Sequence, residues 1–149
     1  MDIYCDTGVV VHVESDSLIG ACLSSIDLHR AQLDGLDFSL ASFTGSNLRA
    51  ASLENAIAHR ADFTNASLIA VWARNADFSS ANLSGCRMNC GNFENACFVD
   101  ANLTNADLDQ ANLIGCNLTG AVLKGATFDR CKADATTIWP DGFPLNISN

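Results

Sequence analysis

The 149-residue sequence has few charged residues, and few of those are basic. Charged residues make up 17% of the chain, against about a quarter in ordinary globular domains. With 8 Lys+Arg against 17 Asp+Glu, the formal net charge is -9, which disfavours direct binding to a nucleic-acid backbone. No apolar run approaches the roughly 18 residues that a membrane span needs, so we expect no membrane segment.

Proline is also scarce, and both prolines, Pro140 and Pro144, lie near the C-terminus. Because proline cannot donate to a β-ladder, its position fits a tail outside a regular β-structure. The first residues, MDIYCDTGVVVHV, carry acids instead of the basic segment of a secretory signal, which favours a cytoplasmic location. The 7 cysteines form no CxxC pair, and their odd number favours reduced thiols. We expect no metal site and no other cofactor.

A five-residue repeat dominates what the sequence does contain. From Ala21 to Ala135 the chain divides without a gap into 23 pentapeptides, such as ACLSS, ASFTG and ANLTN. The central residue, position i, is Leu in 12 of them and Phe in 7, and position i−2 is Ala in 15. Neither an α-helix nor a flat strand keeps residues of this spacing on one face. The pattern therefore predicts a coiled solenoid that turns by a similar angle every five residues, with positions i and i−2 inside.

Position i+2 predicts the shape of each coil. We take four sides per coil, centred in turn on Leu23, Leu28, Leu33 and Phe38, because the i+1 residues after the first side favour a period of twenty. Gly or Asn fills five of six i+2 positions after the first side and five of six after the third, but none after the second and one after the fourth. Because Gly and Asn tolerate a positive φ, we predict left-handed residues at alternate corners and a different turn at the others. The ten predicted left-handed residues are Gly35, Gly45, Asn55, Asn65, Asn75, Gly85, Asn95, Asn105, Gly115 and Gly125.

The A(D/N)LXX pattern, as in ANLTN, ADLDQ, ANLIG and CNLTG, resembles that of the pentapeptide repeat family. The resemblance implies an all-β fold, a right-handed quadrilateral parallel β-helix of about six coils. We expect residues 1–15 to form an N-terminal cap with a strand over 9–13, residues 16–138 to form the β-helix, and residues 139–149 to form a C-terminal cap. In that cap Trp139 or Phe143 is expected to cover the last coil. The IWPDGF segment is similar to the closing segment of many cyanobacterial members.

Two kinds of interior position depart from the repeat. Ala58 and Ala73 take the central position usually filled by Leu or Phe, and we expect neighbouring rings to fill the space beside them. Cys86, Cys116 and Cys131 replace Ala at i−2, so we expect these three thiols to be buried and reduced.

No grouping of a nucleophile with a base predicts catalysis, so we expect no enzyme. A flat-sided rod offers surface, so we expect a scaffold that binds another, unidentified protein; its oligomeric state stays open. The candidate binding patch is Ile69, Trp72 and Arg74, which lie around one corner and include the residue types enriched at binding hot spots. Two placements of Trp72 stay open: the indole faces solvent, or it folds back over Ala73.

The resemblance also implies an alternative function. Some members of the family act in quinolone resistance, resemble a DNA duplex and bind type II topoisomerases. Within residues 16–138 there are 13 acids and 8 bases, which makes the rod acidic. Its best acidic row, on the third side, is interrupted by Arg74 and Ile114, whereas a mimic needs a continuous one. That row consists of Asp34, Glu54, Glu94 and Asp134. DNA mimicry therefore stays the alternative.

Overall fold

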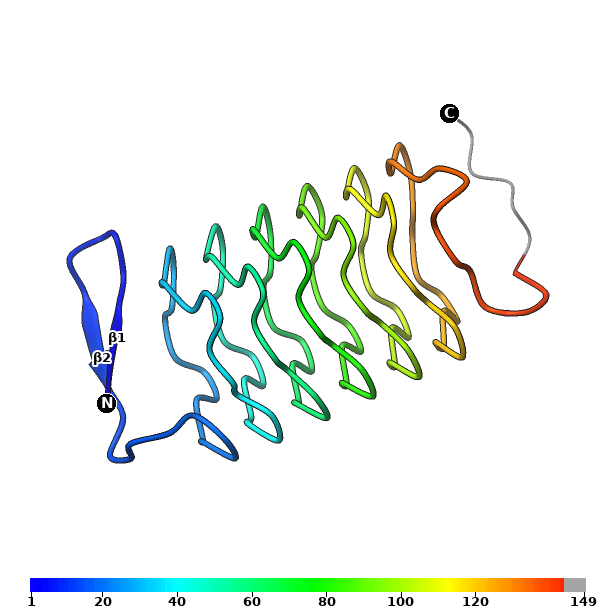
Figure 1. The fold of residues 1–149 in the computed structure, drawn as a ribbon. Helices are drawn as coiled ribbons and strands as arrows, with labels where there is room; N and C mark the ends of the chain where they lie inside the picture. Colours follow the sequence, from blue (N-terminus) through cyan, green and yellow to red (C-terminus); the bar gives the residue numbers. More distant parts are fainter. Residues whose placement is uncertain (144–149) are drawn as a thin grey trace.

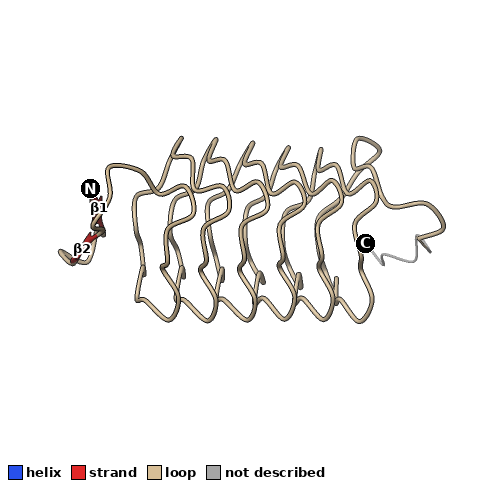
Figure 2. Ribbon diagram, turned by 90° about the horizontal axis from the view of Figure 1, so that it is seen from below, coloured by secondary structure: helices blue, strands red, loops and turns tan. Residues whose placement is uncertain are grey.

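The computed structural model describes residues 1–143, most of which are wound into a regular four-sided rod (Figures 1 and 2). Residues at position i−1 form parallel bridges with residues twenty positions further along the chain. On the first side these bridges connect Cys22, Ser42, Asp62, Asn82, Asn102 and Val122 in turn, one residue from each coil. Similar ladders run along the other three sides, so one coil takes twenty residues, as predicted from the repeat.

The core is a column of side chains from positions i and i−2 inside the rod. Phe78 stacks on Phe98 with ring centroids 5.2 Å apart, and meets Phe63 edge-on at 5.8 Å. Ala58 and Ala73, the small residues at central positions, are fully buried. Aromatic rings of this size and geometry add packing energy beyond the area they bury, so the small residues do not interrupt the core.

Every regular corner carries a left-handed residue at i+2, so the prediction of two alternating turn types was wrong. The ten predicted residues do have φ between +56° and +73°, but Arg30, Leu40 and Ala50, at the other corners, have φ of +59°, +61° and +54°. The cause is that each corner closes the same turn. The carbonyl of residue i accepts from the next i−2 amide, as in Ala31 N to Leu28 O at 2.9 Å. Equal turning at four corners requires this conformation whichever residue is present.

Crowding between coils accounts for glycine at some corners, whereas a Cβ built on Gly35 would meet nothing within 4 Å. A Cβ built on Gly115 would lie 2.1 Å from Oδ1 of Asn95, whose side chain belongs to the preceding coil. A side chain at that position would displace the asparagine. The preference for Gly and Asn at alternate corners does not report a second turn type, because the other corners have a positive φ as well.

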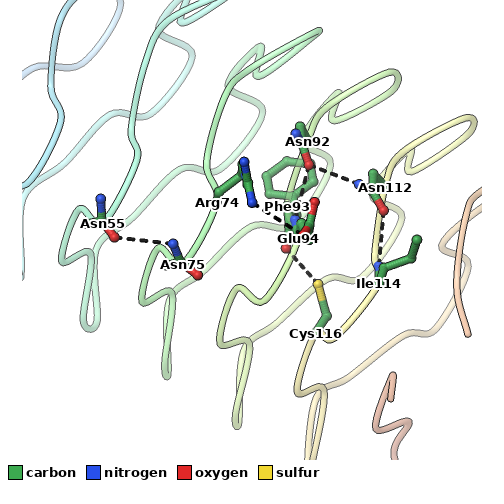
Figure 3. Close-up of polar contacts among 9 residues, drawn as sticks. All are labelled: Asn55, Arg74, Asn75, Asn92, Phe93, Glu94, Asn112, Ile114 and Cys116. Carbon is green, nitrogen blue, oxygen red and sulfur yellow. Dashed lines mark hydrogen bonds and ion pairs between the residues drawn. The ribbon is translucent and has the colours of Figure 1, made fainter. Parts of the chain in front are cut away.

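Asp and Asn recur at i−1 because the amide of residue i+1 lies outside the ladder and needs an acceptor. Oδ1 of Asn92 accepts from Glu94 N at 3.3 Å and from Nδ2 of Asn112, in the next coil, at 3.1 Å (Figure 3). Where the residue is an acid, these bonds favour the charged form. The Ser39 hydroxyl and amide thus hold the pKa of Asp37 below its ordinary value.

A β-hairpin covers the N-terminal end of the rod (Figure 1). It consists of β1 (Asp2–Tyr4) and β2 (Val10–His12), which pair antiparallel. Tyr4 O accepts from Gln32 N at 2.8 Å, and Ile3 is buried in the core. The hairpin thus gives backbone partners and an apolar cover to a coil that would otherwise be open.

Aromatic residues pack at the C-terminal end. Trp139 and Phe143 stack with centroids 4.8 Å apart, and Phe128 of the last coil meets both edge-on. Ile138 bridges to Asn117, twenty-one positions earlier, because one residue is added to this coil. Of the two prolines, Pro140 lies beside this cluster in sequence, and Pro144 lies outside the described residues.

Candidate binding site

Trp72 faces solvent, with 54% of its surface exposed. Its backbone belongs to the third-side ladder, bridged to Ser52 and Asn92, and side chains at this i−1 position point outward. Ala73 beside it is fully buried without any cover from the indole. Of the two placements that the sequence left open, the structure therefore has the exposed one.

The indole borders an open groove of about 840 Å³ that spans the first three coils. Its floor is formed by the small residues Ala50 and Ser52 of the second coil. The larger Arg30 and Gln32 occupy the same two rows in the first coil, and Trp72 stands in the third. In one row the small Ser52 lies between the larger Gln32 and Trp72, and in the other row Ala50 and Ala70 are both small beside Arg30. At about 4.8 Å per coil, the groove runs roughly 10 Å along the rod.

Both carboxylates of the groove already have partners. Oδ1 of Asp34 accepts from the Ser52 hydroxyl at 2.5 Å and from Glu54 N at 2.8 Å. Asp6, from the turn of the N-terminal hairpin, accepts from Nε2 of Gln32 at 2.6 Å and lies 3.9 Å from the Arg30 guanidinium. These acids therefore help to shape the groove and are partly neutralised by it.

The groove also contains donors without protein partners. Among residues 1–143, the Arg49 guanidinium forms no ion pair or hydrogen bond, and the Trp72 indole N–H donates to no acceptor. Both side chains are exposed. The site thus combines a flat apolar surface with a cation that is free to bind an outside group.

The three residues of the candidate patch do not form one site. Arg74 lies 3.3 Å from Oε1 of Glu94, in the next coil, and so points away from the groove (Figure 3). Ile69 is half-buried on the other side of the corner and does not line the groove. The structure brings Trp72 together with Arg49 instead of Arg74. Sequence reasoning missed Arg49 because the groove depends on rows twenty residues apart, where Ser52 and Ala50 stand beside larger neighbours.

The three cysteines expected inside the rod are buried there. Burial raises the pKa of the Cys86 and Cys116 thiols to about 12. Each thiol donates to a core carbonyl, Cys116 to Phe93 O at 2.9 Å (Figure 3) and Cys86 to Phe63 O at 2.8 Å. The pKa of Cys131 is also raised by burial. None of the seven cysteines takes part in a disulfide. These thiols pack as small core residues.

Two further features bear on function. In residues 1–143, no three His, Cys, Asp or Glu side chains are grouped so that they could hold a metal ion. Nor does this part of the chain contain a helix with the length and hydrophobicity of a membrane span.

Comparison with solved structures finds other pentapeptide repeat proteins. HetL, involved in regulating heterocyst differentiation in the cyanobacterium Nostoc sp. strain PCC 7120, is 26% identical, with 79% of this chain and 67% of HetL covered and a TM-score of 0.45. A protein of the Arabidopsis thaliana thylakoid lumen is 27% identical, with 75% and 64% covered and a TM-score of 0.38. QnrB1, a plasmid-mediated fluoroquinolone resistance protein, is 16% identical, with 77% and 66% covered and a TM-score of 0.43.

No protein with a curated description matches the chain significantly. The cytoplasmic location expected from the sequence stays a prediction. The family model for pentapeptide repeats, by contrast, matches residues 21–57, 61–98 and 96–132, in 8 copies. These ranges cover most of the chain and coincide with the coils whose Leu and Phe side chains fill the rod. The chain therefore belongs to the pentapeptide repeat family.

Proposed function

We propose that this protein is a non-enzymatic scaffold that binds another protein, and that the partner docks in the groove beside Trp72. The observation that carries the proposal is the exposed indole in a rod that otherwise buries its large aromatic side chains at regular positions. Tryptophan is enriched among the residues that dominate binding energy, and arginine, here Arg49, is its frequent companion. Exposing an indole also has a cost in solubility, which recognition of a partner would offset.

The groove has the chemistry of binding and not of a hydrolytic site. The groove contains one serine hydroxyl that could act as a nucleophile, on Ser52, and this hydroxyl donates to Asp34 and not to His29, which lines the same groove. In residues 1–143 the His29 ring makes no hydrogen bond to another side chain, so no base is held in place. A nucleophile without a positioned base lacks the arrangement that activates it.

The test compares how well the wild type and two single variants capture a partner protein when each is used as bait. Trp72→Ala removes the indole, and Val122→Ala removes a side chain of similar exposure, 50%, on the first side of the last coil. Both variants and the wild type are immobilised and exposed to extract of the source organism. We expect wild type and Val122→Ala to retain a common partner that Trp72→Ala does not. Equal retention by all three would reject the groove as the docking site.

The alternative is an acidic DNA mimic that binds a type II topoisomerase. The acidic row on the third side supports it, but Arg74 stands within that row and pairs with Glu94. A broken row gives a weaker likeness to a phosphate backbone. Inhibition of gyrase supercoiling at stoichiometric concentration would favour this alternative over the scaffold, whereas unchanged supercoiling is what the scaffold predicts.

A further inference from the structure

We infer that the groove binds an extended peptide segment in which an acidic residue lies two positions from a large apolar residue. This inference rests on the proposed function and adds the chemistry of the partner. It follows from the donors that the groove leaves free, from the partners of its acids, and from its length.

Two of the free hydrogen-bonding groups of the groove are donors, the Arg49 guanidinium and the Trp72 indole N–H. Arg49 has no partner among residues 1–143, and a guanidinium presents five N–H groups in a planar fork that matches a carboxylate. The indole N–H of Trp72 also lacks an acceptor in that part of the chain. An occupant that satisfies both groups has to bring acceptors, and a carboxylate is the strongest acceptor in a peptide.

A basic occupant fits less well, because the acids of the groove are already engaged. Asp34 accepts two hydrogen bonds from the second coil, and Asp6 faces both Gln32 and the Arg30 guanidinium. A Lys or Arg from a partner would compete with these internal donors and would meet Arg49 as a like charge. The groove is therefore locally selective for an acid although the whole chain carries a net charge of -9.

The apolar part of the groove accounts for the large apolar residue of the peptide. The indole of Trp72 lines the groove together with the small apolar residues Ala50 and Ala70. An aromatic or large aliphatic side chain placed there would remove apolar surface from water on both partners. In an extended chain, side chains two residues apart point the same way and lie roughly 6.6 Å apart. A groove of roughly 10 Å holds about three such residues, so the acid and the apolar residue should be separated by one.

The experiment starts from a phage library of random seven-residue peptides selected on the immobilised protein. We expect enriched peptides to contain Asp or Glu two positions from an aromatic or large aliphatic residue. The most enriched peptide is then synthesised with a fluorescent label and titrated by anisotropy. Arg49→Gln should weaken its binding about tenfold, the loss expected for a hydrogen-bonded charge pair at a partly exposed site. Arg87→Gln is the matched control, because Arg87 is exposed but lies outside the groove.

A second peptide tests whether the acid of the first peptide pairs with Arg49. Replacing its acid with the amide should weaken binding to wild type about tenfold but should have little further effect on Arg49→Gln, because both changes remove one interaction. Binding that needs Trp72 but neither Arg49 nor an acid would overturn this inference and leave the proposed function standing. Failure to enrich any peptide would also overturn this inference alone, whereas binding that Trp72→Ala does not change would overturn both.

Discussion

At the scale of single residues, the environment of each cysteine decides its chemistry. Cys86 and Cys116 replace the alanine of the repeat and donate to core carbonyls, whereas Cys22 and Cys90 are exposed. The sequence sufficed to place the buried pair, since position i−2 points inward in every coil. It did not suggest the hydrogen bonds, because these join a thiol to a carbonyl twenty-three residues earlier.

We predict that these two thiols make the protein less stable at alkaline pH. Burial raises their pKa from 9.0 to about 12, so above pH 9 the unfolded chain loses protons that the folded chain keeps. The free energy of unfolding should therefore fall as the pH rises from 9 towards 12, by about 1 kcal/mol per thiol at pH 10. Urea denaturation at pH 7 to 10 measures this. The double variant Cys86→Ala/Cys116→Ala should flatten the decline, and Cys22→Ala/Cys90→Ala should not; an unchanged slope in the first variant would refute the assignment.

Backbone strain at a corner gives a second prediction. Leu40 is exposed and has φ of +61°, a conformation that costs a residue with a Cβ about 1–2 kcal/mol. Leu40→Gly should therefore raise the free energy of unfolding by about 0.5–1 kcal/mol, after the entropy that glycine gains in the unfolded chain is deducted. Leu40→Ala keeps the strained backbone and is the control. If urea denaturation gives both variants the same free energy of unfolding, the positive φ at position 40 carries no such cost.

At the scale of elements, the coil was predictable and its corners were only partly so. Leu and Phe at every fifth residue require a regular turn, and twenty residues per coil follow from the i+1 and i+2 rows. The identical turn at all four corners was not predictable from composition. Arg30 and Ala50 accept a positive φ because coil stacking imposes it, and residue preference records only where that conformation is easy.

The N-terminal hairpin is the element on which the first coil depends. Ile3 of β1 is 1% exposed, so Ile3→Ala should cost about 2–5 kcal/mol, as truncation of a buried side chain does. Val9→Ala, in the exposed turn of the same hairpin, should change stability by less than about 0.5 kcal/mol. Hydrogen exchange should show the amides of the first coil opening before those of the central coils in Ile3→Ala. Uniform opening along the rod would show that the hairpin is not a local cap.

At the scale of the whole molecule, the rod presents regular rows of side chains, and function depends on where those rows are irregular. The sequence singled out Trp72 as a candidate because tryptophan is enriched at binding hot spots. It did not predict the groove. That hollow arises from Ser52 and Ala50 in one coil, Arg30 and Gln32 in the coil before and the hairpin turn beside them. Such a combination becomes visible only when residues twenty positions apart are placed side by side.

The central claim is that the Trp72 indole serves recognition and not the fold, and thermal and urea denaturation of Trp72→Ala test it most directly. An indole that is 54% exposed should contribute little to packing, so the variant should unfold within about 0.5 kcal/mol of wild type. A loss of about 3–5 kcal/mol, the cost of removing a buried aromatic side chain, would show that the indole packs against the coils and would contradict the account.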